Sequence, residues 1–567
     1  MEKKGKGLDL KVQRRIIELV NGAGRAQDIA DRLQLDHDRA CRVLEVRDSH
    51  GPFGLRDLKP LVDLLGDNIL DLWLRHFGPA VYGQWSDPLY ETPGNEARAA
   101  HAALVRTSDP EKGRVLFISG HDQHLGPGYV PTPFLWDPDA PDAESAFFYP
   151  DNEPTDNLYC AGHAFLSDGR LLAAGGGGAG PNNVNRAWKF DPLAGTNGVW
   201  SRTAGDMANA QWYPTVVNLG AGRFLVTGGR PNEPAVEVYD EWSDSFQPVS
   251  VTVPRDFAQN YPGLHLIPWA EGGVFYTSTG FGNAGSGTYT GTVPTGTFYL
   301  RFDGPGSAEW VDLPGTMGSG NRVKGMSAPL FIGPIAGSYI QKILVVGGNG
   351  QDTAEAYNLS TLTWEPATTI PGDAGATARN NANVVLLPDG TAFVCGGSGS
   401  GGDVRTSALY DPLTNAWSPM DALTYGRAYH SVALLLPSGQ VMVTGGQADS
   451  AENRTIEVFS PPYLFRGARP QIASAPGVIH HGREFQIESP DAGDIERVVL
   501  VRPMAVTHQT DTEQRVVGMQ FTRSGNTLSV TAPGGVHPHP IAPRGYYLLF
   551  VLNGNGVPSQ GRFVRLH

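Results

Sequence analysis

The chain has 567 residues and a formal net charge of −14, and it contains 72 glycines and 44 prolines. Its length exceeds one ordinary domain, and this glycine and proline content is typical of many short strands joined by tight turns. The negative charge argues against binding to a nucleic-acid backbone as the main function, because that interaction needs a basic face. We therefore expect a globular, all-β protein with a small or neutral ligand and no nucleic-acid partner.

Cysteine usage and the start of the chain bear on its compartment. The three cysteines, Cys41, Cys160 and Cys395, lie in different segments, so no disulfide framework is indicated. The sequence has no apolar stretch long enough to span a membrane, and no hydrophobic signal core follows residues 1–7. As written, the chain is expected in the cytoplasm, or outside the cell if a leader has been removed, with no membrane partner.

The first part of the chain has a different pattern from the rest. Apolar residues recur at helical spacing between residues 8 and 78, which predicts a small α-helical domain, a cap, over residues 1–80. Residues 42–58 resemble a helix-hairpin-helix segment, a module found in DNA-binding proteins. Basic and acidic residues are nearly balanced over the cap, so we favour a packing or partner role for it over DNA binding.

A short segment then recurs seven times. It consists of a turn that usually contains glycine, an apolar strand and usually Gly-Gly, and it occupies residues 113–120, 169–176, 222–229, 273–280, 341–348, 390–397 and 439–446. Repeats of about 50 residues, each forming one small sheet, are typical of kelch-type propellers. We therefore predict a seven-bladed kelch-type β-propeller over residues 81–460.

Aromatic residues follow several of these repeats, and the repeat itself stops after residue 460. Trp200, Trp242, Trp364 and Trp417 are interpreted as core between blades, because large aromatic side chains dominate such packing. Alternating strands such as residues 497–501 and 546–552 predict an immunoglobulin-like (early-set) β-sandwich over residues 461–567.

The repeat register brings candidate ligands together. Counting nine residues back from the turn glycine gives Cys160, Tyr213 and His430, with Tyr429 beside the last. Equivalent positions of different blades meet at one mouth of the axial channel, so we expect these side chains to gather around a metal. Nitrogen and oxygen donors suit a tetragonal Cu(II) better than zinc. His508, on a loop of the following domain, would supply another strong ligand if that loop enters the channel.

At these residues the chain resembles the copper radical oxidases, the family of galactose oxidase, the glyoxal oxidases and the bacterial alcohol oxidases. The matching motifs are residues 427–439, which begin Arg-Ala-Tyr-His-Ser, residues 506–515 and residues 545–559. The resemblance covers about residues 100–567 and includes the order of the domains.

The resemblance implies a role for each candidate residue. In that family a thioether joins the cysteine to the first tyrosine, which is an equatorial copper ligand and carries a stable radical. Cys160 and Tyr213 would be this pair, Tyr429 the axial tyrosine and proton-accepting base, and His430 and His508 the equatorial histidines. The implied cofactors are one copper ion and a self-processed Cys160–Tyr213 thioether radical.

Three features of the sequence bear on substrate recognition. Arg379 matches the arginine that binds sugar hydroxyls in galactose oxidase, and a loop-stabilising salt bridge is an equal alternative. Galactose oxidase places a tryptophan after the Gly-Gly of the tyrosine-bearing blade, whereas Gly229 is followed here by Arg230-Pro231-Asn232. The helical cap also replaces a sugar-binding domain of galactose oxidase. We therefore expect a different shield over the radical and a substrate other than galactose.

Several other residues that could bind metals are given structural interpretations. The pairs His121 and His124, His480 and His481, and His537 and His539 are interpreted as solvated loops, and Cys395, inside an apolar strand, as core.

Together these features predict a copper-dependent alcohol oxidase. It would oxidise primary alcohols, or hydrated aldehydes, by one level and reduce O2 to H2O2, acting as a monomer. The alternative is a non-catalytic kelch propeller that binds a glycan or a protein partner. The combination of one cysteine, two tyrosines and two histidines favours the enzyme, because binding alone does not require all five. The alcohol itself, the activating partner and the role of the cap stay open.

Overall fold

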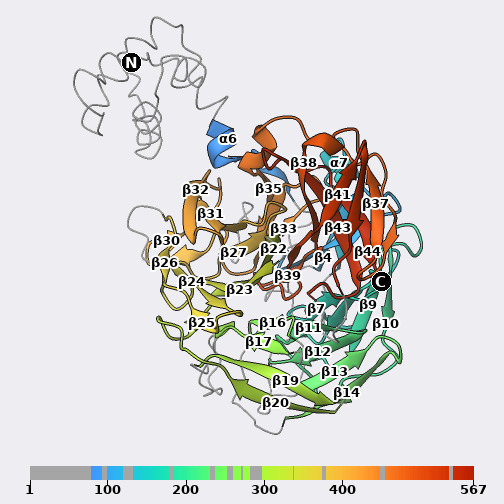
Figure 1. Cartoon of the computed structure of the whole chain (residues 1–567). Coiled ribbons are helices and arrows are strands. Elements are labelled where there is room, and N and C mark those ends of the chain that lie inside the picture. Colours follow the sequence, from blue (N-terminus) through green and yellow to red (C-terminus); the bar gives the residue numbers. More distant parts are fainter. Residues whose placement is uncertain are drawn as a thin grey trace, which may run out of the picture. The chain divides into compact units, whose positions relative to one another are not determined.

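The computed structural model describes residues 78–91, 99–118, 132–177, 184–229, 236–251, 260–269, 273–280, 296–304, 306–335, 338–372, 378–446, 454–534 and 541–567. The expected helical cap therefore lies outside the described residues, apart from the short helix α6 (Gly78–Tyr82). Residues Gln84–His567 form one unit, which is built almost entirely of strands in its described parts (Figure 1). This confirms the all-β class. No helix in these ranges is long and apolar enough to cross a membrane.

In the described part of the chain, seven sheets of four or five strands precede the last hundred residues, and nearly all their strand pairs are antiparallel. The first sheet contains β3 (His101–Arg106), β4 (Gly113–Ile118), β5 (Phe134–Trp136) and β6 (Phe147–Phe148), joined by β39 (Ala505–Thr507). The second contains β7 (Gly162–Phe165), β8 (Leu171–Ala174), β9 (Ala187–Asp191) and β10 (Val199–Arg202). The third contains β11 (Thr215–Gly220), β12 (Arg223–Thr227), β13 (Val236–Asp240) and β14 (Ser245–Pro248). A short helix, α7 (Ala143–Ala146), precedes β6.

The other four sheets follow the same plan. They are β16 (Leu264–Leu266), β17 (Val274–Tyr276), β19 (Phe298–Gly304) and β20 (Ser307–Asp312) with β15 (Ser250–Val251); β22 (Met326–Ile335), β23 (Ser338–Val346), β24 (Thr353–Asn358) and β25 (Thr363–Trp364) with β26 (Thr368–Thr369); β27 (Asn383–Leu386), β28 (Ala392–Cys395), β31 (Ser407–Asp411) and β32 (Ala416–Met420); and β33 (Ser431–Leu435), β34 (Val441–Gly445) and β35 (Thr455–Ser460) with β1 (Gln84–Trp85) and β2 (Leu89–Glu91). Two-stranded sheets join β18 (Thr279–Gly280) to β21 (Arg322–Val323) and β29 (Ser398–Gly399) to β30 (Gly402–Asp403).

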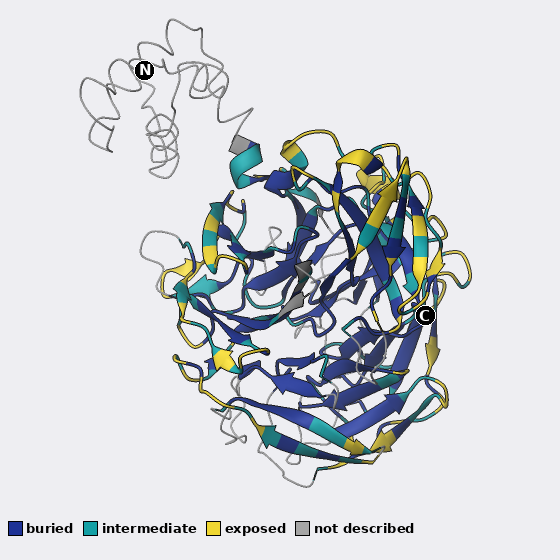
Figure 2. Ribbon diagram, in the orientation of Figure 1, coloured by how far each residue is buried: buried dark blue, intermediate teal, exposed yellow. Residues whose placement is uncertain are grey.

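Each of the seven sequence repeats contributes the second strand of one of these sheets, for example β8, β12 and β34. The turn glycine before that strand is needed for its backbone conformation, since Gly169 and Gly439 have φ of +94° and +79°. The first strands β7, β11, β27 and β33 are buried along their whole length (Figure 2). Neighbouring first strands contact one another, as β7 does β11 and β27 does β33.

The expected aromatic core is present with one correction. Trp200 is buried and packs against Phe190 with ring centroids 5.1 Å apart. Trp242, by contrast, is 64% exposed, so its interpretation as core is wrong. Trp242 lies in the turn between β13 and β14, and Phe246 on β14 pairs with Tyr239 in its place, with ring centroids 5.0 Å apart.

The C-terminal residues form two further sheets. One contains β36 (Val478–Ile479), β44 (Arg562–Leu566), β43 (Gly545–Asn553), β38 (Ile495–Val501) and β40 (Val516–Met519), and the other β37 (Glu484–Glu488), β42 (Thr527–Thr531) and β41 (Phe521–Ser524). Short 3-10 helices occupy Pro462–Phe465 and Ala492–Asp494. Ile487 and Leu528 from one sheet share a hydrophobic core with Val498 and Leu549 from the other. The two sheets therefore pack as a sandwich.

Candidate metal centre

Four residues at the ends of buried strands have an unusual backbone conformation. Cys160, Tyr213 and His430 have φ of 62°, 66° and 67°, and His508 has φ of 49°. Left-handed φ is uncommon for residues other than glycine and persists where surrounding contacts hold it, often at functional sites. All four are residues that the sequence analysis selected.

Backbone hydrogen bonds connect these positions from one sheet to the next. The backbone N–H of Tyr213 donates to the Cys160 carbonyl at 3.0 Å, and that of Tyr261 donates to the Tyr213 carbonyl at 2.8 Å. The structure therefore places Cys160 and Tyr213, which belong to consecutive repeats, next to each other at the same end of their sheets.

Two phenols and two imidazoles meet at this end. The hydroxyl oxygens of Tyr213 and Tyr429 are 2.9 Å apart. The rings of His430 and His508 are nearly perpendicular, at 83°, with centroids 4.6 Å apart, and the centroid of Tyr213 lies 5.0 Å from that of His508. Four donors from three separate segments of the chain thus form one cluster.

The thiol of Cys160 lies against the same cluster. Its Sγ is 3.7 Å from His508 Nε2, and the residue is fully buried. Burial raises the pKa of the thiol, whereas side-chain hydrogen bonds to Tyr213, Trp212 and Tyr159 act in the opposite direction. The sulfur is therefore protonated at neutral pH and close to Tyr213.

The protonation of the cluster suits a divalent cation. Burial raises the pKa values of Tyr213 and Tyr429, so both phenols are neutral at pH 7 without a cation. Burial, followed by the nearby His430 and His101, lowers the pKa of His508, which keeps that imidazole in the neutral form that binds metals. Two imidazole nitrogens and two phenolate oxygens are a donor set that fits Cu(II).

Hydrogen bonds also select the tautomer of His508. The Tyr261 hydroxyl donates to the Ala161 carbonyl at 3.0 Å and lies 3.3 Å from Thr507 Oγ1, so the Thr507 hydroxyl donates to Tyr261. Thr507 Oγ1 can then accept from His508 Nδ1, 2.8 Å away. This assignment leaves His508 Nε2, which faces Cys160, without a proton.

His508 reaches the cluster on a loop of the C-terminal domain that bonds to several sheets. The His508 N–H donates to the Ala100 carbonyl at 3.1 Å, and Gln509 Nε2 donates to the Ser431 carbonyl at 2.8 Å. Thr512 Oγ1 donates to the Val216 carbonyl at 2.6 Å, and Gln514 Nε2 to the Val384 carbonyl at 2.9 Å. The loop therefore enters the space among the sheets, as a ligand role for His508 requires.

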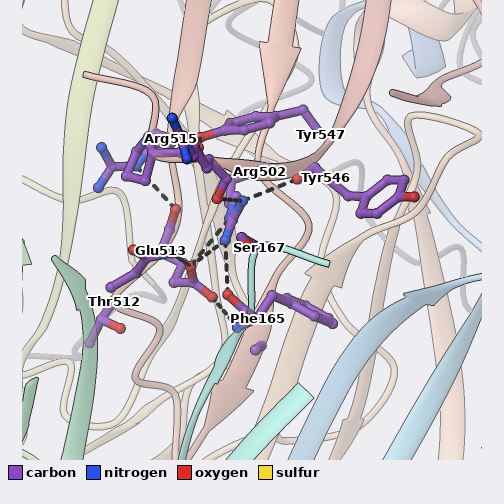
Figure 3. Close-up of polar contacts among 12 residues, drawn as sticks. Phe165, Ser167, Arg502, Thr512, Glu513, Arg515, Tyr546 and Tyr547 are labelled. Carbon is purple, nitrogen blue, oxygen red and sulfur yellow. Dashed lines mark hydrogen bonds and ion pairs between the residues drawn. The ribbon is translucent and has the colours of Figure 1, made fainter. Parts of the chain in front are cut away.

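A buried ion pair anchors the far end of this loop (Figure 3). Arg502 Nη2 donates to Glu513 Oε1 at 2.8 Å and to the Phe165 carbonyl at 3.1 Å, while Glu513 Oε2 accepts from the Phe165 N–H at 2.5 Å. Both charged side chains are almost completely buried. The pair thus joins the C-terminal domain to β7, the strand that follows Cys160.

Three aromatic residues of the centre were not predicted as site residues. The Tyr159 hydroxyl lies 3.1 Å from His430 Nε2, and the Trp212 ring lies beside Tyr213 with centroids 4.6 Å apart. Tyr261 packs against Tyr213 with centroids 4.9 Å apart. Tyr159 and Trp212 directly precede Cys160 and Tyr213 in the sequence, which is the signal that could have identified them. Residues 230–232 lie outside the described residues.

Arg379 makes contacts within its own sheet. Its side chain is 2% exposed, and its guanidinium donates to Thr406 Oγ1 at 2.7 Å, to the Thr406 carbonyl and to the Pro371 carbonyl at 3.0 Å. Arg427 makes the same type of contact with Thr455 in the next sheet. These hydrogen bonds agree with the loop-stabilising alternative. A substrate-binding role for Arg379 stays a prediction.

The structure describes some of the other residues that were given structural interpretations in the sequence analysis. His481 Nε2 bonds to the Ala542 carbonyl at 2.8 Å, and Cys395 is fully buried on β28. The pairs His121 and His124, and His537 and His539, lie outside the described residues. Within the described ranges, no three His, Cys, Asp or Glu side chains are arranged to hold a metal.

Comparisons with known proteins find relatives of this chain. Residues 469–566 match the family described as galactose oxidase-like, early set domain. A galactose oxidase from Gibberella zeae is 27% identical over 525 residues, which cover 85% of this chain and 70% of that protein. A WSC domain-containing protein from Arthroderma benhamiae is 26% identical over 458 residues, 72% of this chain, and the alignment spans only 46% of that relative.

A solved structure has a similar fold. It is a fungal alcohol oxidase of the AA5 family in complex with copper, and it superposes with a TM-score of 0.68 over 86% of this chain and 99% of its own. Its sequence identity to this chain is 22%, so the likeness concerns the fold.

Proposed function

We propose a specific activity for this chain, whose resemblance to the copper radical oxidases is confirmed by these relatives. The protein oxidises primary alcohols, or hydrated aldehydes, and reduces O2 to H2O2. One observation carries the proposal: two phenols and two imidazoles from three segments of the chain form one cluster, with a buried thiol against it.

Tyr213, Tyr429, His430 and His508 would hold one copper ion. When bound, the ion together with a radical on the thioether-linked Cys160–Tyr213 pair supplies the two one-electron acceptors that a two-electron oxidation needs. Tyr429 is the more exposed of the two phenols. It would accept the hydroxyl proton of the alcohol.

Tyr213 has the complementary role. It is 7% exposed and is packed between Trp212 and Tyr261, so its ring is shielded from water and from side reactions. Its oxygen, 2.9 Å from that of Tyr429, would receive the hydrogen atom from the carbon of the alcohol once the pair carries its radical. The alcohol thus loses two protons and two electrons, and O2 receives them as H2O2.

The proposed architecture follows from the repeats. We propose that the seven sheets form a seven-bladed kelch-type propeller over residues 81–460, and that residues 461–567 form the immunoglobulin-like domain. Contacts between neighbouring first strands support this arrangement, because side chains of equivalent register then converge at one channel mouth. A non-catalytic propeller is not favoured, since glycan or protein binding gives no reason for this donor cluster.

The test uses the full chain loaded with copper and treated with a mild oxidant. We expect strong visible absorption and H2O2 formation with a panel of primary alcohols and hydrated aldehydes, measured by a peroxidase-coupled assay. The same preparation after removal of copper is the control. A copper-loaded protein that stays colourless and forms no H2O2 with any member of the panel would contradict the proposal.

A further inference from the structure

Two buried histidines behind the metal centre form a line of hydrogen bonds that ends at the backbone of Cys160. The Cys160 N–H donates to His101 Nε2 at 3.0 Å. His101 Nδ1 in turn lies 3.1 Å from His163 Nε2. His101 is fully buried and His163 is 5% exposed. Neither histidine belongs to the donor cluster.

These contacts determine where the ring protons lie. A backbone N–H can only donate, so His101 Nε2 accepts and carries no proton. Burial, followed by the nearby His163 and His430, lowers the pKa of His101, so the ring is neutral and its single proton is on Nδ1. That proton is donated to His163 Nε2, which therefore accepts. We call His101 and His163 the histidine strut; both of its hydrogen bonds are donated in the direction from Cys160 to His163.

Cys160 is a residue that needs such support. Its φ of 62° is uncommon for a non-glycine residue, and such a conformation persists where the surroundings hold it. Its carbonyl accepts from the Tyr213 N–H at 3.0 Å, and its N–H is taken up by His101. Both polar groups of its backbone are thus held, one by Tyr213 and one by the histidine strut.

We propose that His101, oriented by His163, is a positioning residue that holds Cys160 in the conformation from which its sulfur reaches Tyr213. The inference rests on the proposed function to the extent that it concerns the thioether. In that step the S–H bond of Cys160 and one ring C–H bond of Tyr213 are replaced by a C–S bond. The two electrons and two protons released convert O2 to H2O2. His101 contributes no electron or proton and sets only the position of the thiol.

The first test is hydrogen exchange, followed by mass spectrometry, in the copper-free full chain. His101→Leu removes the acceptor of the Cys160 N–H, whereas His101→Gln keeps an oxygen that can accept it. We expect peptides containing the Cys160 amide to exchange about tenfold faster in His101→Leu, since a buried donor loses its partner. His101→Gln is expected to stay close to the wild type.

A matched control is His265→Leu. His265 is also buried in a first strand, β16, and bonds to Ser327 Oγ at 2.9 Å, away from Cys160. Unchanged exchange at Cys160 in His101→Leu, or an equal increase in His265→Leu, would overturn the inference. If His101→Leu does not fold, His163→Leu replaces it, because it removes only the partner that orients His101.

The second test follows thioether formation after addition of copper and O2, as the mass of the linked peptides minus two hydrogens. We expect His101→Leu to form the link at least about tenfold more slowly, with unchanged copper affinity because His101 is no ligand. A wild-type rate in His101→Leu would overturn the inference. A wild type that forms no link contradicts the proposed function instead, and the exchange test still decides the role of His101.

Discussion

At the scale of single residues, the chemistry depends on side chains held in conformations that only their neighbours permit. Cys160, Tyr213 and His430 share left-handed φ values, and each precedes a fully buried strand. A thiol that is buried in this way is inert in most proteins. Here it lies against a phenol and an imidazole, and this neighbourhood distinguishes it from Cys395, which is buried inside a strand.

We predict that Cys160→Ser and Tyr213→Phe each abolish alcohol oxidation, by at least about 100-fold, because neither variant can form the thioether radical. Both variants keep the size of the side chain, so thermal unfolding is expected near that of the wild type. The measurement is peroxide formation by copper-loaded protein. Cys395→Ser is the control, and it should retain activity if the buried core tolerates the hydroxyl. Wild-type turnover in Cys160→Ser would rule out the radical mechanism.

A second residue-scale prediction concerns the ligand from the C-terminal domain. His508→Ala removes one of two imidazoles, so copper affinity is expected to fall at least about tenfold, a typical loss when a metal's surroundings are changed. Equilibrium dialysis against copper measures it. The exposed His480→Ala, in the same domain, should bind copper as the wild type does. Equal copper binding in both variants would remove His508 from the site.

At the scale of elements, the loop from β39 to β40 carries polar groups into the core. Asp511 Oδ1 accepts from the Glu513 N–H at 2.8 Å, and Oδ2 from the Ala505 N–H at 3.1 Å. Burial, opposed by the hydrogen bond from Glu513, raises the pKa of Asp511 from 3.8 to about 7. The folded loop therefore binds a proton over a pH range in which the unfolded chain has lost it.

This shift predicts a pH dependence of stability. Between pH 3.8 and about 7 the folded state binds more protons at Asp511 than the unfolded state, so the free energy of unfolding falls as the pH rises. The total effect is of order 4 kcal/mol at most. Chemical unfolding at several pH values measures it, and Asp511→Asn should flatten the slope. Asp411→Asn, in a surface turn, is the control. A slope that is the same in Asp511→Asn and the wild type would contradict this assignment.

At the scale of the whole molecule, the candidate ligands connect segments that are far apart in sequence. Tyr213, Tyr429 and His430 come from two different sheets, and His508 comes from the C-terminal domain. A copper ion held by all four would bind the folded chain and not the unfolded one. Binding of this kind stabilises the fold by mass action.

Copper is therefore expected to raise the thermal unfolding temperature of the full chain. The stabilisation is about 2.7 kcal/mol at a free copper concentration a hundred times the Kd. Differential scanning calorimetry with and without copper measures the shift, and His508→Ala should lose most of it. A shift of the same size in His508→Ala would mean that copper stabilises the protein from another site.

The sequence predicted much of this arrangement, and the corrections have local reasons. The glycine turns set the register of the strands. Cys160 and Tyr213 each lie nine residues before such a turn glycine, and this shared register allowed both to be selected. Trp242 was misassigned because a one-dimensional pattern cannot separate a turn from the strand that follows it. The contacts of Arg379 with Thr406 depend on the pairing of β28 with β31, which the arginine motif does not encode.

By itself, the sequence determined the all-β class and the resemblance to the copper radical oxidases, because both rest on local patterns of glycines, apolar strands and short motifs. Only the tertiary structure decided which side chains surround the thiol. Cys160 and His508 are 348 residues apart, and His101 and Cys160 are 59 apart. Contacts over such separations arise from the packing of whole sheets, and no spacing along the chain specifies them.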